Sequence, residues 1–259
     1  MTRLLPYSEV GTGIPLVLIH GFPHDRRLWE PQLNGLRNSA RLIVPDLRGF
    51  GAATDVPATM GMEEHAADVK TLLEHLRITG AVICGLSMGG YVALAFAARF
   101  PGALRGLILC STKAGADSNE AKSAREATAL AVLDKGVARL ADDMLPKMLA
   151  PTTLAARPEL GASIRSMMAE QRVDGVVAAL RGMAARPDRT GMLAGIHVST
   201  LIIAGERDTL IPSTESGTMS KSVPRAHLVI VPDAAHLPNA EAPEVFNEAA
   251  KGFLGRALK

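Results

Sequence analysis

Aromatic residues and cysteines are both scarce in this chain of 259 residues. It has one Trp, two Tyr and six Phe, and its two cysteines, Cys84 and Cys110, each end a strand-like apolar run. Cysteines in such positions are typical of small apolar packing residues. We therefore exclude the class of small secreted domains that disulfide bonds hold together.

An excess of one charge is also missing. Lys and Arg together number 28 and Asp and Glu number 26, which gives a net charge of +2 with both signs dispersed along the chain. A protein that binds nucleic acid through its phosphates needs a basic patch or stripe. We therefore expect no nucleic-acid partner.

One long uncharged run is present, at residues 81–98. A membrane helix that dimerises through Gly85 and Gly89 is one interpretation. We do not favour it, because the run is at the lower length limit for a membrane span and its central glycines lower helix propensity. Residues 1–9 lack the apolar core of a signal peptide. We expect a cytoplasmic protein with no membrane partner.

Spacings that would indicate a metal or a nucleotide are absent. His20 and His24 are four residues apart, but Gly21 and Pro23 between them indicate a loop rather than one face of a helix. The glycines around Ser87 lack the ending of a Walker sequence and the spacing of a dinucleotide fingerprint. We expect neither a metal nor a cofactor.

Short apolar runs alternate with helical periods along most of the chain. Residues 4–10 and 15–19 are predicted to form a hairpin whose second strand is buried on both faces. Further strands rich in β-branched residues are predicted at 41–44, 81–84, 107–110, 200–204 and 227–231, with helical segments such as 63–76 between most of them. This alternation predicts an α/β fold with a mostly parallel central sheet and helices on both faces.

Residues 117–189 interrupt the alternation. This segment is rich in Ala, Arg and Met, has helical periodicity and contains no strand-like run. Ligands of open α/β sheets bind outside the carboxyl ends of the strands, so an insertion at this point would roof the site. We therefore predict a core domain, residues 1–116 and 190–259, and a helical cap, residues 117–189. The alternative is further helix packed on the sheet.

Ser87 lies in the run Gly85-Leu86-Ser87-Met88-Gly89-Gly90, between a strand-like segment and a helix-like one. A serine on such a turn has its hydroxyl pushed out of the sheet, and flanking glycines remove side chains that would collide in the bend. The helix that follows directs free N–H groups and its positive end toward the same place. This context predicts a nucleophilic serine.

A serine nucleophile needs a base, and the base needs an acid that orients it. His236 follows the last predicted strand and Asp208 follows the strand before it. Both therefore leave the edge of the sheet at which Ser87 lies, in the chain order Ser, Asp, His. We predict His236 as the base and Asp208 as the acid, with Glu206 and Asp233 as competing acids.

Backbone N–H groups are predicted to form the oxyanion hole. One is that of Met88, directly after the nucleophile, and the other is that of Phe22, because Pro23 has no N–H. We interpret His20 in the same loop as a buried structural imidazole. The histidines at 65, 75, 197 and 227 are interpreted as solvated or packing residues.

These motifs together resemble those of the α/β-hydrolase superfamily over nearly the whole chain. They are His20-Gly21-Phe22-Pro23, Asp46-Leu47-Arg48-Gly49-Phe50-Gly51, the Ser87 turn, Gly205-Glu206-Arg207-Asp208 and His236. Within the superfamily, the chain resembles the group of 3-oxoadipate enol-lactonases, carboxylesterases and cofactor-free haloperoxidase-like perhydrolases. The resemblance implies Ser87, Asp208 and His236 as a catalytic triad, with Phe22 and Met88 as oxyanion donors.

The cap narrows the predicted reaction. Dehalogenases and epoxide hydrolases of this superfamily use an aspartate nucleophile, and the epoxide-opening members use cap tyrosines as acids. This chain has Ser87 at the turn and no Tyr, Trp or Phe in residues 117–189, so we exclude both classes. Methionines would give an adaptable, apolar roof, unless they only fill gaps in the core. Those that we consider are Met144, Met148, Met167, Met168 and Met183. Arg165, Arg172 and Arg181 would suit a substrate that carries a carboxylate.

We predict a serine carboxylic ester hydrolase that acts on small to medium apolar esters through an acyl-enzyme. Lactonase or perhydrolase activity is the enzymatic alternative. A ligand receptor that keeps the fold without turnover is the alternative from another class. The expected partner is a small-molecule ester, and no oligomeric state is predicted.

Overall fold

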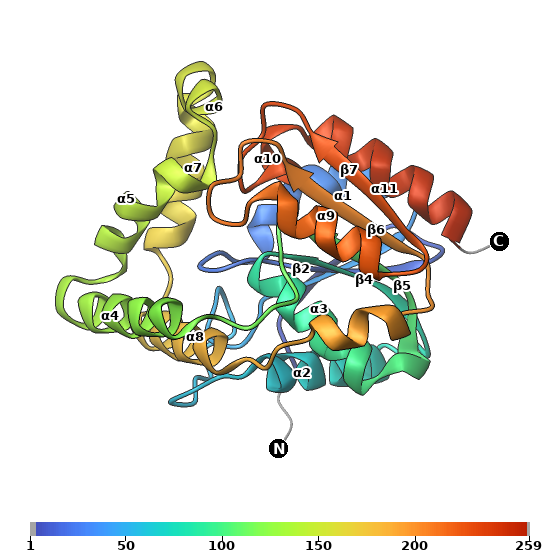
Figure 1. Ribbon diagram of the computed structural model, residues 1–259, viewed down its shortest axis with the longest axis horizontal. Coiled ribbons are helices and arrows are strands. Elements are labelled where there is room, and N and C mark those ends of the chain that lie inside the picture. Colours follow the sequence, from blue (N-terminus) through green and yellow to red (C-terminus); the bar gives the residue numbers. More distant parts are fainter. Residues whose placement is uncertain (1–3, 258–259) are drawn as a thin grey trace.

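A seven-stranded sheet forms the centre of the computed structural model (Figure 1), which describes residues 4–257. Residues 1–3, part of the stretch examined for a signal peptide, lie outside the described residues. The strands are β1 (Tyr7–Val10), β2 (Pro15–Ile19), β3 (Arg41–Pro45), β4 (Ala81–Leu86), β5 (Leu104–Cys110), β6 (Thr200–Gly205) and β7 (Ala226–Val231). Their order is β1-β3-β2-β4-β5-β6-β7, and every neighbouring pair is parallel except β1 with β3. The predicted α/β fold with a mostly parallel sheet is confirmed.

The predicted hairpin of residues 4–10 and 15–19 is wrong. β1 pairs antiparallel with β3, with Tyr7 opposite Pro45, whereas β2 lies between β3 and β4 and is parallel to both. β2 is buried from Leu16 to Ile19, and a strand buried on both faces belongs in the interior of a parallel sheet. β1 is only half-buried, which suits the edge position that it occupies.

Helices cover both faces of the sheet (Figure 1). Alternate side chains of β2 enter different cores: Val17 and Ile19 pack with α2 (Met62–His75) and α3 (Met88–Arg99), and Leu16 and Leu18 pack with α1 (Glu30–Leu36) and α11 (Pro243–Ala257). This alternation follows from the two-residue period of a strand. The sheet is thus the middle of three layers. The other core helices are α9 (Ser213–Ser222) and α10 (Pro238–Glu241), with 3-10 turns η1 (Arg26–Trp29), η2 (Pro101–Ala103) and η3 (Thr190–Gly195).

Along the chain, five helices come between β5 and β6. In the structure they lie to one side of the sheet (Figure 1). They are α4 (Asn119–Lys135), α5 (Val137–Met148), α6 (Pro151–Ala156), α7 (Pro158–Ala169) and α8 (Val173–Ala185). α4 packs on α8, and α5 packs on α7. We refer to residues 117–189 as the cap.

Gln171, between α7 and α8, fastens the cap to the core. Its side chain is buried, its amide nitrogen donates to Asp25 Oδ2 (2.9 Å), and its amide oxygen accepts the backbone N–H of Gly51 (2.9 Å). Both partners belong to loops of the core. One side of the cap is therefore held on the loops that follow β2 and β3.

The uncharged run 81–98 does not form one helix, because the turn at Ser87 divides it between β4 and α3. Across residues 4–257, the structure contains no helix with both the length and the apolar character that a membrane span requires.

His65 is buried in α2 without a hydrogen-bond partner for either ring nitrogen among residues 4–257. Burial, together with the nearby His20 and Arg48, lowers the pKa of His65 to about 3. The imidazole is therefore neutral in the folded protein at physiological pH. An unfolded histidine titrates near pH 6.5.

We predict that His65 makes the fold sensitive to acid. Between about pH 6.5 and pH 3 the unfolded state binds a proton at this residue that the folded state does not, so stability falls by about 1.4 kcal/mol per pH unit. In urea unfolding, His65→Leu should reduce the stability loss between pH 7 and pH 5 by about 2 kcal/mol. The exposed His75 supplies the control, His75→Leu, which should behave like the wild type. An unchanged pH dependence in His65→Leu would contradict the prediction.

Candidate active site

Ser87 forms the turn between β4 and α3, with φ 54° and ψ −114°. Residues other than glycine seldom adopt a positive φ, so the conformation is strained. The Ser87 amide donates to the carbonyl oxygen of Cys110 (2.9 Å), and the Thr112 hydroxyl donates to the carbonyl oxygen of Ser87 (2.9 Å). Hydrogen bonds from β5 and the loop after it thus hold the strained turn at the carboxyl end of the sheet.

The loop after β2 runs directly against this turn, and two glycines make the contact possible. A Cβ atom on Gly21 would lie 2.8 Å from Leu86 Cδ2 and 3.3 Å from Ser87 Cβ. One on Gly89 would lie 2.3 Å from the carbonyl oxygen of Ile19. Because both residues lack a side chain, the backbone that carries Phe22 lies beside Ser87.

His236 and Asp208 meet at the ends of the last two strands. His236 Nδ1 lies 2.8 Å from Asp208 Oδ2, and both side chains are buried. Asp208 Oδ1 accepts the backbone N–H groups of Leu210 and Ile211, each at 2.9 Å. With the proton on Nδ1 and directed to the carboxylate, Nε2 of His236 is free to accept a proton.

The two competing acids lie elsewhere. Glu206 accepts the backbone N–H of Asp233 (3.1 Å), and the Asp233 carboxylate forms an exposed ion pair with Arg207. The carboxylate that contacts His236 is that of Asp208. The order of the strands, rather than closeness in sequence, therefore determines which acid reaches the histidine.

His20 is buried and bridges two loops. Its Nδ1 donates to the carbonyl oxygen of Gly21 (2.9 Å), and its Nε2 accepts the backbone N–H of Leu47 (3.0 Å). Burial lowers the pKa of His20, which keeps the imidazole neutral, as this pair of bonds requires. This geometry fits the structural role that the sequence suggested.

Ser87 and His236 line one cavity, of about 250 Å³. Phe22 and Tyr91 line it from the core, and Met144, Met148 and Met183 line it from the cap. The prediction that Met167 and Met168 also belong to this roof is wrong, because α7 packs on α5 and these two side chains fill the core there. The cap therefore covers the cavity with three of the five methionines.

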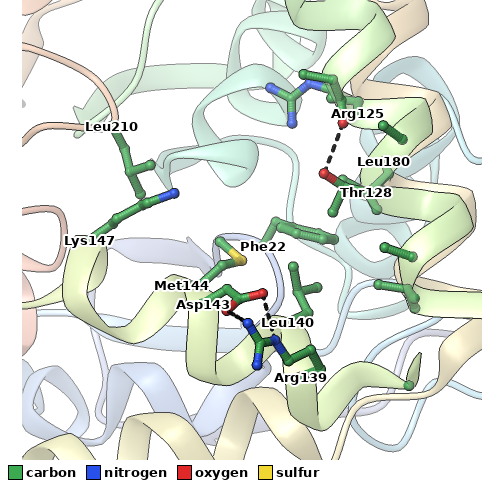
Figure 2. Close-up of a pocket in the computed structure, with 15 residues that line it drawn as sticks. Phe22, Arg125, Thr128, Arg139, Leu140, Asp143, Met144, Lys147, Leu180 and Leu210 are labelled. Carbon is green, nitrogen blue, oxygen red and sulfur yellow. Dashed lines mark hydrogen bonds and ion pairs between the residues drawn. The ribbon is translucent and has the colours of Figure 1, made fainter. Parts of the chain in front are cut away.

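A larger cavity, of about 730 Å³, adjoins the first (Figure 2). The two share the lining residues Phe22, Arg125, Met144 and Leu210. Figure 2 shows Leu210 and Lys147 on one side and Arg125, Thr128 and Leu180 on the other, with Phe22 and Met144 between them. The cavity that contains Ser87 thus borders a wider, mostly apolar space under α4 and α5.

Cationic side chains do line the smaller cavity, but they are not the ones that we considered from the sequence. Arg165, Arg172 and Arg181 form surface ion pairs with Asp142, Asp174 and Glu126 and do not line it. Lys113 and Arg125 line it instead, together with Asp117. The spacing of Ala121, Arg125, Thr128 and Val132 could have revealed Arg125, because it marks one face of α4.

The Asp117 carboxylate pairs with three cations, two of which line the cavity. Its partners are Arg125, Arg186 (2.8 Å) and Lys113 (3.6 Å). Burial raises the pKa of Asp117, but hydrogen bonds from Arg186 and Arg125 outweigh it and hold that pKa well below its ordinary value. The two cations and one anion that line this wall leave it net positive, and Arg186, which does not line the cavity, adds a third cation next to Asp117.

The strained turn at Ser87 generates a stability prediction. Ser87→Gly and Ser87→Ala both remove the hydroxyl, but only alanine keeps a Cβ at the positive φ, so the glycine variant should be the more stable by about 1 kcal/mol or more. Thermal unfolding of the two variants measures the difference. At Ser220, inside α9, the order should reverse, because glycine destabilises a helix relative to alanine. An alanine variant at 87 that is as stable as the glycine variant would show that the turn is not strained.

Comparisons with known proteins identify the family to which this fold belongs. The family described as alpha/beta hydrolase fold matches residues 14–243. A solved thermophilic esterase from Thermogutta terrifontis, with malate bound, is 41% identical, with a TM-score of 0.96 over 98% of this chain and 94% of that one. The enol-lactonase from Burkholderia xenovorans LB400 is 28% identical, with a TM-score of 0.90 over 97% of this chain and 96% of that one.

A relative found by sequence is also named as an enol-lactonase. The 3-oxoadipate enol-lactonase 2 of Acinetobacter baylyi is 26% identical over 241 residues, which cover 93% of this chain and 88% of the relative. Since the family match extends from β2 to the start of α11, the protein belongs to the α/β-hydrolase family.

Proposed function

We propose that the protein is a serine carboxylic ester hydrolase with Ser87 as nucleophile, His236 as general base and Asp208 as the acid that orients it. One observation carries the proposal: Ser87 and His236 line the same cavity, and His236 Nδ1 lies 2.8 Å from Asp208 Oδ2. The esterases and enol-lactonases among the relatives support it, because both classes cleave an ester bond.

In this proposal the reaction has two halves. His236 Nε2 takes the Ser87 proton while Oγ bonds to the ester carbonyl carbon, and the same proton then passes to the leaving alcohol as its C–O bond breaks. His236 Nε2 then takes a proton from water as the water oxygen attacks the acyl carbon, and this proton passes to Ser87 Oγ as the bond from Oγ to the acyl carbon breaks, which releases the carboxylic acid. Asp208 holds the imidazole in the required tautomer throughout.

We assign the oxyanion hole to the backbone N–H groups of Met88 and Phe22. Met88 is the first residue of α3, so its N–H has no acceptor within the helix. Phe22 lies on the loop that Gly21 brings against Ser87. Each such donor contributes about 2.7–4 kcal/mol to the stabilisation of the tetrahedral intermediate.

Small to medium apolar esters are the substrates that we propose. Phe22, Met144, Met148, Met183 and Leu210 give the cavity an apolar lining on several sides. Methionine adapts its shape to different ligands, and one methylene more or less in such a pocket changes binding by only about 1–3 kcal/mol. Broad tolerance of acyl-chain length follows.

The triad generates the first prediction of activity. A fluorophosphonate should label Ser87 alone and abolish hydrolysis of p-nitrophenyl butyrate, which peptide mapping and rate measurements test. Ser87→Ala and His236→Ala should lose similar amounts of activity because the two residues act as a unit. Asp208→Asn should retain some activity, and Glu206→Gln should match the wild type. A fully active Asp208→Asn variant together with an inactive Glu206→Gln variant would show that Glu206, rather than Asp208, is the acid that orients His236.

A lactonase or other hydrolase of carboxylate-bearing substrates is the second candidate. The cavity wall favours it, because Lys113 and Arg125 line the cavity against one carboxylate, that of Asp117, which also pairs with Arg186. One Nη atom of Arg125 lies 3.5 Å from Met183 Sδ, a weak acceptor, which a substrate carboxylate would replace as the stronger acceptor. Relatives named as enol-lactonases also support this candidate.

Matched esters separate the two candidates. We expect ethyl butyrate to be hydrolysed with a kcat/KM at least equal to that of monoethyl succinate, which has a carboxylate in addition. The second candidate requires the reverse order, and Arg125→Met should then lower kcat/KM for monoethyl succinate about 10–100-fold, the value of one charge-assisted hydrogen bond. Arg181→Met, on the outer surface of the cap, is the control for loss of a positive charge.

A further inference from the structure

Glu241, the last residue of α10, has a buried carboxylate that the triad does not use; 8% of the residue is exposed. Its Oε1 accepts the backbone N–H of Ala235 at 2.6 Å, and Ala235 directly precedes His236. Its Oε2 accepts the backbone N–H of Ala150 and the hydroxyl of Thr153, each at 2.7 Å. One oxygen of Glu241 thus accepts a hydrogen bond from the loop of the proposed base, and the other accepts hydrogen bonds from the cap.

The cap segment that Glu241 binds is close in sequence to the cavity. Ala150 comes two residues after Met148, which lines the cavity with Ser87 and His236. Arg157, also in the cap, donates from Nη2 to the carbonyl oxygen of Glu241 (2.6 Å). The segment between α5 and α7 is therefore fastened to the end of α10 by three hydrogen bonds, of which two reach the carboxylate.

Only a carboxylate satisfies this set of donors. The groups at Ala235 and Ala150 are backbone N–H groups, which cannot reverse to become acceptors, and they bind opposite oxygens of Glu241. A glutamine would place its NH₂ group against one of the two N–H groups. A buried carboxylate is also costly unless hydrogen bonds compensate it, and the three donors at Glu241 supply that compensation.

We propose that Glu241 is a positioning residue, which fixes the loop that carries His236 and seats the cap over Ser87 through the same side chain. The proposal rests on the function proposed above, in which His236 is the general base. Asp208 orients the imidazole ring through Nδ1, whereas Glu241 fixes the backbone from which the ring projects. Misplacement of a catalytic group by about 1 Å costs on the order of 100-fold in rate.

Replacement of Glu241 by glutamine tests the positioning of the base. Glu241→Gln should lower kcat for p-nitrophenyl butyrate about 10–100-fold and slow fluorophosphonate labelling of Ser87 by a similar factor, because both reactions need His236 in place. We expect the amide oxygen of the glutamine to keep the two cap-side donors, which leaves its NH₂ group against the N–H of Ala235, so KM should change less than about threefold. Glu244→Gln, which removes an exposed charge three residues later, is the control and should match the wild type.

Replacement of the cap-side donors tests the second half of the proposal. Ala150 has φ −63° and ψ 146°, which proline adopts, so Ala150→Pro removes its N–H at a backbone conformation that suits proline. The double variant Ala150→Pro/Thr153→Val leaves the bond from Glu241 to Ala235 intact. We expect it to raise KM more than it lowers kcat, the opposite of Glu241→Gln.

The outcomes are distinct. Wild-type kcat and labelling rate in Glu241→Gln would overturn the proposal while leaving the hydrolase function standing. Equal changes in kcat and KM in both variants would also overturn it, because Glu241 would then only stabilise the fold. If Glu241→Gln does not fold, Glu241→Asp takes its place. Its side chain is one methylene shorter and cannot reach both Ala235 and Ala150, and we expect the same losses of kcat and of labelling rate. Full ester turnover by Ser87→Ala would instead remove the proposed function itself.

Discussion

The rest of the site depends on the close contact between the Ser87 turn and the loop after β2. Gly21 and Gly89 leave no room for a Cβ atom at this contact, and Ser87 itself is held at a positive φ. Such strain persists only where other interactions hold the residue in place. Here the hydrogen bonds of Ser87 with β5 and with Thr112 do so. Because β2 and β4 are neighbours in the sheet, the loop and the turn leave the same edge together.

Buried carboxylates fix the loops around that edge. Asp208 accepts two backbone N–H groups of its own loop as well as His236, and Glu241 accepts from the next loop and from the cap. Asp46 accepts the N–H groups of Arg26 (2.8 Å) and Ala52 (2.9 Å) and so joins the loops after β2 and β3. Each carboxylate compensates its own burial with donors from irregular backbone, which would otherwise lack partners. The loops at this edge of the sheet are thus joined to one another by hydrogen bonds to buried carboxylates.

The sequence predicts most strands and the residues of the proposed triad, because apolar runs mark the strands and Ser87, Asp208 and His236 follow three of them. It does not predict that β1 pairs with β3, since the local hairpin signal contains no information about which strand needs two neighbours. Nor does composition show how a helix is rotated, so Arg125 was missed while exposed arginines of the cap were considered. The partners of Glu241 in the cap lie 91 and 88 residues away, beyond the reach of any short motif.

The cap contains none of the three residues of the proposed triad, which all lie on loops of the core. In the proposed function, side chains in residues 117–189 can therefore be exchanged and substrate selectivity altered while the three triad residues stay unchanged. The exception is the short stretch around Ala150 and Thr153, which shares a carboxylate with the histidine loop. A chimera that carries a relative's cap should thus inherit its selectivity only if that stretch still offers an N–H and a hydroxyl to Glu241.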